Sequence, residues 1–255
     1  MLLALLVAFS ALTLVWVISL SLRDVSIIDV FWGIGFVLIG IAAIWRHGGL
    51  DPRSKLIFAI VAVWALRLAL HLFLRWRRLG HEDRRYSAMR RKAGPRFPVT
   101  SLFTVFWLQA GVMWVVSLPL QQAFAAAPTP LGPLDLIGAA IALLGILVEA
   151  VADYQLTRFG RDPANRGRVL ETGLWAWSRH PNYFGDFMMW WGFFALGMAA
   201  GGPWWIIASP LVMSALLIRY SGAGLMEETI KDRRPGYADY VRRTSLFVPL
   251  PPKKA

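Results

Sequence analysis

The sequence predicts an all-α, polytopic membrane protein, and three observations support this fold class. Hydrophobic residues make up 57% of the 255-residue chain and charged residues 16%, whereas soluble domains average roughly 45–50% and 25%. Apolar runs of roughly 18 or more residues recur, and each is long enough to cross a bilayer core of about 30 Å. The basic residues gather in the short stretches between these runs, as they do in membrane proteins oriented by the positive-inside rule.

About seven transmembrane helices are expected, and they form a single integral-membrane domain over residues 1–255. The first apolar run has no basic segment before it and no small-residue cleavage site after it, so we expect a retained helix and not a signal peptide. The last run contains two prolines and follows its neighbour closely, which predicts a tight helical hairpin. The expected spans are residues 1–22, 26–45, 56–75, 99–120, 133–157, 181–201 and 203–222.

The distribution of Lys and Arg predicts the orientation of these spans. Twenty-three of the 27 Lys and Arg residues fall in the loops after the first, third and fifth spans or in the C-terminal tail. Only Arg46, Arg53 and Lys55 fall on the opposite side. The N-terminus is therefore expected outside and the C-terminus in the cytoplasm.

Several classes of function are disfavoured by composition. The chain has no cysteine, which excludes disulfides and thiolate chemistry. Four scattered histidines without paired ligand spacing predict no metal site. The net charge of +12 lies in loops between spans, so we expect no nucleic acid partner. The one G-x-G, Gly33 and Gly35, lies inside a span and favours close helix packing over nucleotide binding.

Ionisable residues within the spans are candidate functional residues. Each has a structural alternative, because an arginine near an interface can snorkel and a carboxylate can pair across a helix contact. Taken together they favour a polar cavity that opens to the cytoplasm. They are Asp29 in the second span, Arg67, His71 and Arg75 on one face of the third, Glu149 and Asp153 at the end of the fifth, and Asn182 and Asp186 in the sixth.

Three basic loops carry the remaining motifs: LGHEDRRYSAMRRKAG, RFGRDPANRGRVLETGLWAWSRHPNYFGD and MEETIKDRRPGYADYVRRTSLFVPLPP. Arginine side chains suit the recognition of phosphate or carboxylate groups. The alternative is that the loops bind anionic lipid and fix the topology. In RHPNYFGD, Pro181 suits the first turn of a helix, so Asn182 and Asp186 should start on one face.

Four segments resemble the bacterial branch of the steroid 5-alpha-reductase-like membrane proteins: WAWSRHPNYFGD, RPGYADYVRRTSLFVPLPP, SIIDVFWGIGF and DRRYSAMR. The RHPxY turn also resembles that of the isoprenylcysteine carboxyl methyltransferases and the sterol reductases, which belong to the same superfamily. The animal-type steroid reductases carry a Gln-Glu-Leu-Pro motif in an early span, whereas the corresponding span here offers Asp29 in a different context.

The resemblance implies NADPH as cofactor, bound from the cytosol by the C-terminal half of the chain. A gap-free match through GRVLETGLWAWSRHPNYFGD places the family's cofactor-binding arginine, asparagine and acid on Arg168, Asn182 and Asp186. Residues 133–255 would then mainly bind the cofactor and residues 1–125 mainly form the substrate cavity. The other implied cofactor residues are Asp153 and Tyr154 upstream, Arg179, His180 and Tyr183 in the turn, and Tyr237, Tyr240 and Arg243 in the tail.

The expected activity is the NADPH-dependent reduction of an activated C=C bond, an enone, in a steroid-like or other lipid that enters from the bilayer. Asp29 and Tyr86, with His71 behind them, are the candidate acids for the carbonyl oxygen. The expected location is the bacterial inner membrane, with the cofactor site facing the cytoplasm.

Two alternatives stay open. The RHPNY turn and the paired Glu227 and Glu228 are compatible with an S-adenosylmethionine-dependent methyltransferase of the isoprenylcysteine carboxyl methyltransferase type. The long basic loops favour a cofactor with a pyrophosphate and a 2'-phosphate. A non-catalytic lipid-binding or assembly protein is the second alternative, and it leaves the carboxylates in the spans unexplained.

Overall fold

The computed structural model describes residues 1–48, 51–220 and 236–253, and within these ranges the chain is helical. Glu227 and Glu228 lie outside the described residues. The chain divides into two compact units. The first contains residues 1–135 and 196–209, and the second contains residues 136–195 and 210–255.

Among the described residues, five helical segments are long and apolar enough to cross a membrane: Leu2–Leu22, Ile27–His47, Pro52–Leu79, Arg84–Val116 and Pro133–Arg161. They correspond to the first five expected spans, so the expectation of a helical, membrane-spanning chain is confirmed. The two later apolar runs form the helix Pro181–Ala199 and a shorter helical run, Trp204–Ile218.

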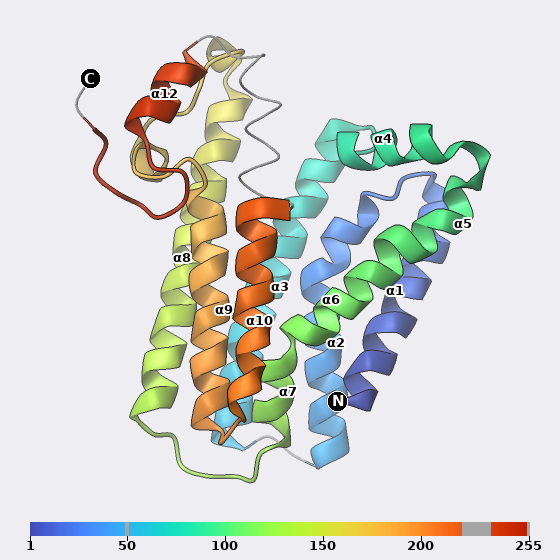
Figure 1. Ribbon diagram of the computed structural model, residues 1–255, viewed down its shortest axis with the longest axis vertical. Helices are drawn as coiled ribbons and strands as arrows, with labels where there is room; N and C mark the ends of the chain where they lie inside the picture. The colour runs from blue at the N-terminus through green and yellow to red at the C-terminus, as the bar shows by residue number, and fades with distance from the viewer. Residues whose placement is uncertain (49–50, 221–235, 254–255) are drawn as a thin grey trace. The chain divides into compact units, whose positions relative to one another are not determined.

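In the first unit, α1 (Leu2–Leu22), α2 (Ile27–His47) and α3 (Pro52–Leu79) lie side by side (Figure 1). Gly33 allows α2 to approach α3, because a Cβ atom there would lie 3.0 Å from Ala65 Cα. Gly35 faces Met113 in the same way. The small residues of the second span therefore serve helix packing, as expected.

Local signals set the ends of α3. Asp51 accepts hydrogen bonds from the backbone nitrogens of Arg53 and Ser54, at 2.9 and 3.3 Å, and Pro52 occupies the first helical position. Gly80 ends the helix with a φ of 64°, in the left-handed region that glycine adopts without strain.

The predicted fourth span, residues 99–120, differs from the structure at both ends. Helical structure begins with α4 (Arg84–Ala93), and a 3-10 turn with Pro95 (Gly94–Arg96) joins α4 to the span. The span itself is α5 (Phe97–Ser101), a π-helical stretch (Leu102–Trp107) and α6 (Leu108–Val116). At Ser117 the direction changes and α7 (Leu118–Ala125) begins, with Pro119 in its first turn.

A buried ion pair lies at the other end of the first unit from α4. Arg53 Nε and Nη2 donate to the two oxygens of Asp135 at 2.7 and 2.9 Å, and Nη1 donates to Thr129 Oγ1 at 2.8 Å. Arg53 and Asp135 are both buried. Arg53 is thus a structural residue, because its charge is held by a partner on a distant part of the chain.

In the second unit, α8 (Pro133–Arg161) and α9 (Pro181–Ala199) run side by side over much of their length (Figure 1). A Cβ atom on Gly185 would lie 2.5 Å from Glu149 N, and one on Gly145 would lie 2.5 Å from Gly185 O. Gly192 meets Ala142 similarly. Contact between backbones of this kind is typical of helices in membranes.

The remaining described elements of the chain are short. They are the 3-10 turns Pro163–Asn165 and Gly173–Ala176 between α8 and α9, the 3-10 turn Trp204–Ile207 and α10 (Ala208–Ala215), the π-helical stretch Leu216–Tyr220, and α12 (Tyr237–Arg243).

Candidate functional site

The first candidate site forms around Asp29, in the first turn of α2. The hydroxyl of Tyr86 donates a hydrogen bond to Asp29 Oδ1 at 2.7 Å, and Arg85 Nη2 donates to Oδ2 at 2.8 Å. Gln109 Nε2 lies 3.4 Å from the oxygen of Tyr86. Each carboxylate oxygen therefore has one donor, and the carboxylate fixes the direction of the phenol O–H.

Burial differs between the two members of this pair. Tyr86 is 6% exposed, whereas the side chain of Asp29 is 29% exposed. Helix α4 explains the difference, because it places Tyr86 on the face turned toward the unit. Asp29 therefore accepts a hydrogen bond from a buried hydroxyl while its own side chain is partly exposed.

The loop between α3 and α4 holds the site by docking on the turn between α1 and α2. The backbone nitrogen of Asp83 donates to Ser26 Oγ at 2.7 Å, and Trp76 Nε1 donates to Asp24 Oδ2 at 2.7 Å. Although burial raises the pKa of Asp83, hydrogen bonds from Arg85 and the charges of Arg85 and Arg75 outweigh it and lower the pKa overall.

Glu82 adds a second connection between the same two loops. Arg90 Nε and Nη2 bind its carboxylate at 2.8 and 2.7 Å, and the backbone nitrogen of Val25 donates to Glu82 Oε1 at 3.0 Å. A forked arginine contact of this kind limits movement of both partners. The position of α4 relative to α2 is therefore set by charged contacts, and Tyr86 is placed with it.

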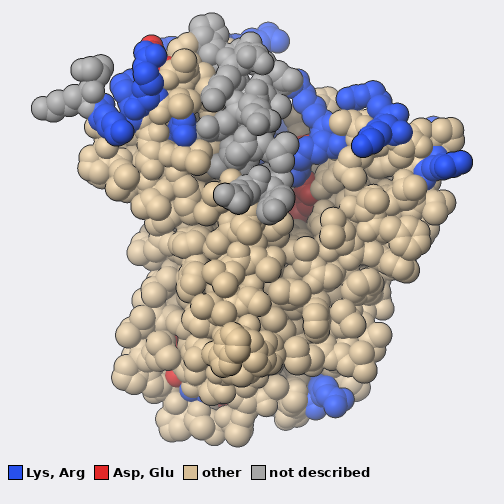
Figure 2. All heavy atoms as spheres, viewed as in Figure 1, with Lys and Arg blue, Asp and Glu red and all other residues tan. Residues whose placement is uncertain are grey.

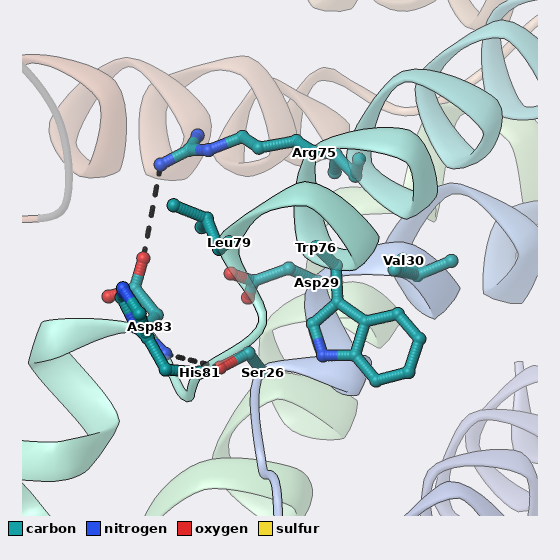
Figure 3. Close-up of a pocket in the computed structure, with 9 residues that line it drawn as sticks. Ser26, Asp29, Val30, Arg75, Trp76, Leu79, His81 and Asp83 are labelled. Atoms are coloured by element: carbon teal, nitrogen blue, oxygen red, sulfur yellow. Dashed lines mark hydrogen bonds and ion pairs between the residues drawn. The ribbon is translucent and has the colours of Figure 1, made fainter.

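A small hollow opens beside the carboxylate of Asp29 (Figure 3). Its volume is about 30 Å³, which suits about one water molecule, and it is too small for a lipid. Tyr86 is not among the residues that line it. They are Ser26, Asp29, Val30, Leu72, Arg75, Trp76, Leu79, His81 and Asp83.

The third predicted acid, His71, does not line this hollow. It is half-buried on α3, one turn after Arg67 and one turn before Arg75 on the same helical face. Arg75 Nη2 lies 3.9 Å from Asp83 Oδ2. Of the three predicted acids, the structure thus brings Asp29 and Tyr86 together.

The second candidate site forms where α9 begins, against the end of α8. Asn182 Nδ2 donates to Asp153 Oδ1 at 3.2 Å, and the close contact between the two helices brings these residues together. Asp153 is buried, and Asp186 lies half-buried one turn after Asn182. Asn182 Oδ1 is also buried, and no described residue donates a hydrogen bond to it.

The turn before α9 is held by the C-terminal segment. The backbone nitrogen of Arg179 donates to Ser245 O at 2.9 Å, and Ser178 Oγ donates to Phe247 O at 2.8 Å. The backbone nitrogen of Leu250 donates to the carbonyl of Trp177 at 3.0 Å. The described part of the tail therefore packs on this turn.

His180 and Tyr183 stack at the start of α9, with ring centroids 5.5 Å apart and planes 5° from parallel. His180 is buried, and this burial, together with the charge of Arg179, lowers its pKa from 6.5 to about 4. The imidazole is therefore neutral near pH 7. A neutral ring offers one donor and one acceptor to its surroundings.

The predicted tail residues take different positions. The Tyr240 hydroxyl donates to Trp175 O at 2.6 Å, and the Tyr237 ring lies 5.9 Å from the Tyr240 ring. Both tyrosines are buried, so they position the turn. Arg243 Nη2 binds Glu171 Oε2 at 2.7 Å at the surface.

Arg168 lies in the exposed loop between α8 and α9. It lines an open hollow of about 380 Å³ with Arg166, Gly167, Val169 and Glu171. Gly167 has a φ of 78°, which suits its place in this turn. Glu171, which lines this hollow, also binds Arg243.

Tyr154 is the predicted cofactor residue that stands most clearly apart. Its side chain is 63% exposed, while that of its neighbour Asp153 is buried. Adjacent residues of a helix point about 100° apart, so α8 directs the two side chains to different surroundings.

Two groups of residues at these sites were not singled out from the sequence. Arg85 was one of nine basic residues in its loop, and only the fold shows that it binds Asp29. The Ser178 hydroxyl and the backbone carbonyls of Ser245 and Phe247 form contacts that span about 70 residues of sequence. The one available signal was the proximity of Arg85 to Tyr86 in DRRY.

The sequence is similar to known proteins over most of its length. The chain matches, over residues 15–244, a family described as "Protein of unknown function (DUF1295)", which is associated with steroid reductase-like proteins. It is also similar to an uncharacterized protein of Schizosaccharomyces pombe, with 23% identity over 96% of this chain and 78% of the relative. No solved structure matches the chain. Because the match covers most of its length, including both candidate sites, the chain belongs to the DUF1295 family.

Proposed function

We propose that the protein is an NADPH-dependent membrane oxidoreductase that reduces an activated C=C bond, an enone, in a lipophilic substrate. The observation that carries this proposal is the hydrogen bond from Tyr86 to Asp29, with Arg85 on the second carboxylate oxygen. Enone reduction requires a donor for the carbonyl oxygen, and the Tyr86 phenol would supply one when its single O–H turns from Asp29 to the substrate. Methyl transfer to a carboxylate has no comparable need.

The second unit fits a phosphorylated dinucleotide. Arg166 and Arg168 line an open hollow, and arginine suits phosphate groups. The buried amide oxygen Asn182 Oδ1 lacks a donor among the described residues, which suits an amide N–H of a ligand. We assign cofactor binding to these residues and to the turn Arg179–Tyr183.

NADPH, when bound, supplies a hydride to the β carbon of the enone. Tyr86 donates a hydrogen bond to the carbonyl oxygen, where negative charge develops as the C=C bond accepts the hydride. Asp29 holds the phenol in place before the substrate binds, and Arg85 stays on Asp29 when the phenol O–H turns to the carbonyl oxygen. The α carbon takes up one proton from water, so the product is the saturated ketone.

The proposal includes a membrane arrangement. The five apolar segments, α9 and the run Trp204–Ile218 would give seven spans, with the N-terminus outside and the C-terminus in the cytoplasm. In the bacterial inner membrane, both candidate sites would then be reached from the cytoplasm. The substrate, a steroid-like or other lipid, would enter from the bilayer.

Ligand binding by the purified protein tests the cofactor class. Titration with NADPH and with S-adenosylmethionine, each followed by calorimetry in the same detergent, should show saturable binding of NADPH. Binding of S-adenosylmethionine alone would replace the reductase proposal with the methyltransferase alternative. Binding of neither ligand, by protein that unfolds cooperatively, would favour a non-catalytic lipid-binding or assembly protein.

Turnover tests the reaction class. A set of lipophilic enones should accelerate NADPH oxidation, and mass spectrometry should show a product heavier by two hydrogens. With deuterated NADPH, one deuterium should appear at the β carbon. Exchange of deuterium into the α carbon only would be incompatible with hydride transfer to an enone.

A further inference from the structure

We propose that the outward face of α4, together with the end of α3, binds the headgroups of anionic phospholipids. This surface consists of Arg77 and Arg78 on α3, Arg84, Arg91 and Lys92 on α4, and Arg96 after it, and we call it the basic face. The inference does not depend on the proposed reaction.

The charges at this end of the first unit do not balance. Residues 23–29 and 75–96 contain ten Lys or Arg side chains and four carboxylates. All four carboxylates are engaged in contacts inside the unit: Asp24 with Trp76, Asp29 with Tyr86 and Arg85, Glu82 with Arg90, and Asp83 with Arg85. The basic face is left with no acidic partner among the described residues.

Helix α4 separates its paired cations from its unpaired ones. At 100° per residue, Tyr86, Met89 and Arg90 fall on one side of the helix. Arg84, Arg91 and Lys92 fall on the other side, and all three are exposed. This pattern gives a helix that is fixed to the protein on one side and strongly basic on the other.

The surroundings of the basic face indicate a lipid surface as the partner. α4 follows the segment Pro52–Leu79 and begins the segment Arg84–Val116, and both segments are long and apolar enough to cross the membrane. Exposed apolar side chains lie close to the basic residues in the sequence: Leu79 is 41% exposed and Val99 is 62% exposed. Figure 2 shows a group of blue side chains around α4, with tan surface beside them, and a smaller blue group at the opposite end of the molecule. Basic clusters next to a membrane span attract anionic headgroups.

A soluble anion would pair with the same basic side chains but would leave the neighbouring apolar side chains, Leu79 and Val99, uncovered. An anionic phospholipid matches both the charged and the apolar side chains, because its phosphate pairs with arginine or lysine while its acyl chains cover Leu79 and Val99. We therefore assign the basic face to the bilayer.

Native mass spectrometry of the full chain in detergent tests the assignment. The wild type should retain phosphatidylglycerol more tightly than phosphatidylcholine. The variant Arg91→Gln/Lys92→Gln should lose this preference, with phosphatidylglycerol binding on the order of tenfold weaker. The matched control Arg46→Gln/Lys55→Gln removes two exposed charges elsewhere and should leave the preference unchanged.

Three results would overturn the proposal. The first is equal retention of the two lipids by the wild type. The second is an equal loss in the variant and the control. The third is full competition by soluble glycerol 3-phosphate at a matched concentration, which would identify a site for a soluble anion.

Hydrogen exchange on the wild type gives a test that does not depend on any variant. Backbone amides of residues 84–96 should exchange more slowly in nanodiscs that contain phosphatidylglycerol than in nanodiscs of phosphatidylcholine alone. Amides of residues 133–150 should exchange equally in both. Equal exchange of residues 84–96 in the two bilayers would contradict the proposal.

Discussion

Tyr86 on α4 and Asp29 on α2, 57 residues apart in sequence, share a hydrogen bond of 2.7 Å. Neither residue forms this contact through local structure. The loop after α3 docks on the turn before α2, and the contacts of Glu82 and Ser26 hold the two helices in the required position.

The hydroxyl of Tyr86 should be required for reduction and not for cofactor binding. Tyr86→Phe removes the donor to the carbonyl oxygen, and kcat should fall by roughly 10²–10⁴-fold. The affinity for NADPH should be unchanged. Ser87→Ala, which removes a hydroxyl on the same helix, is the control. Steady-state kinetics with an enone measures the effect, and wild-type kcat in Tyr86→Phe would exclude this residue as the donor.

Replacing Asp29 should have a smaller effect than replacing Tyr86. Asp29→Asn keeps an oxygen that can accept from the phenol but loses the ion pair with Arg85. The phenol is then held less firmly, so kcat should fall while NADPH still binds. Parallel measurements of kcat and of the dissociation constant separate the two effects. A larger loss than in Tyr86→Phe would assign the donor role to Asp29.

Asn182 should contribute directly to NADPH binding. Asn182→Ala removes the buried amide oxygen and the hydrogen bond to Asp153, and a loss of about 1 kcal/mol corresponds to roughly fivefold weaker binding. Calorimetric titration measures the dissociation constant. Unchanged affinity, in protein with a wild-type melting temperature, would move the cofactor away from α9.

Arg168 should contribute by its charge. Arg168→Ala should weaken the binding of NADPH, and of NADH less if the guanidinium contacts the 2'-phosphate. Arg158→Ala removes another exposed arginine of the second unit and serves as the control. An equal effect of both substitutions would indicate only a general electrostatic attraction.

His180 should make stability depend on pH. The unfolded histidine takes up a proton near pH 6.5, whereas the folded one stays neutral until about pH 4. Stability should therefore be complete above pH 6.5 and fall as the pH drops toward 4, by an amount on the order of 3 kcal/mol. Melting temperatures between pH 4 and 8 measure this loss. His180→Gln should show a shallower decline, and an unchanged decline would assign the effect to other groups.

The contact between α8 and α9 should not tolerate a methyl group. In Gly185→Ala the new Cβ atom would lie 2.5 Å from Glu149 N, so the helices must separate, and overpacking of this kind typically costs about 1–3 kcal/mol. Gly160→Ala, on α8 with no atom within 4 Å of the added Cβ, is the control and should not be destabilised. Thermal unfolding compares the two variants. Similar melting temperatures would mean that the helices do not pack this closely.

Much of the fold could be predicted because its signals are local. Apolar length identified the first five spans, and Gly80 and the Asp51–Pro52 pair mark the ends of α3. The fourth span was placed less well, because α4 is polar and Ser117 ends the span before the apolar run ends. Hydropathy detects burial in lipid and does not detect a change of direction.

The candidate sites could be predicted in part. Its position within a span selected Asp29, the search for an acid added Tyr86, and the resemblance to a known family selected Asp153 and Asn182. The structure shows that Tyr86 contacts Asp29 and that Asn182 contacts Asp153. It also separates Tyr154 from Asp153, although the two are adjacent in the chain.

By itself, the sequence determined that this is a helical membrane protein. It also determined where the chain passes from polar to apolar surroundings and which polar residues lie at those borders. These properties depend on the free energy of transfer from water to lipid, which adds up along a local segment. Only the tertiary structure decided that Arg85 and Tyr86 bind Asp29, that Arg53 binds Asp135, and that the tail holds the turn before α9. Such pairs depend on the distance between residues far apart in the chain, and that distance is set by how the helices pack.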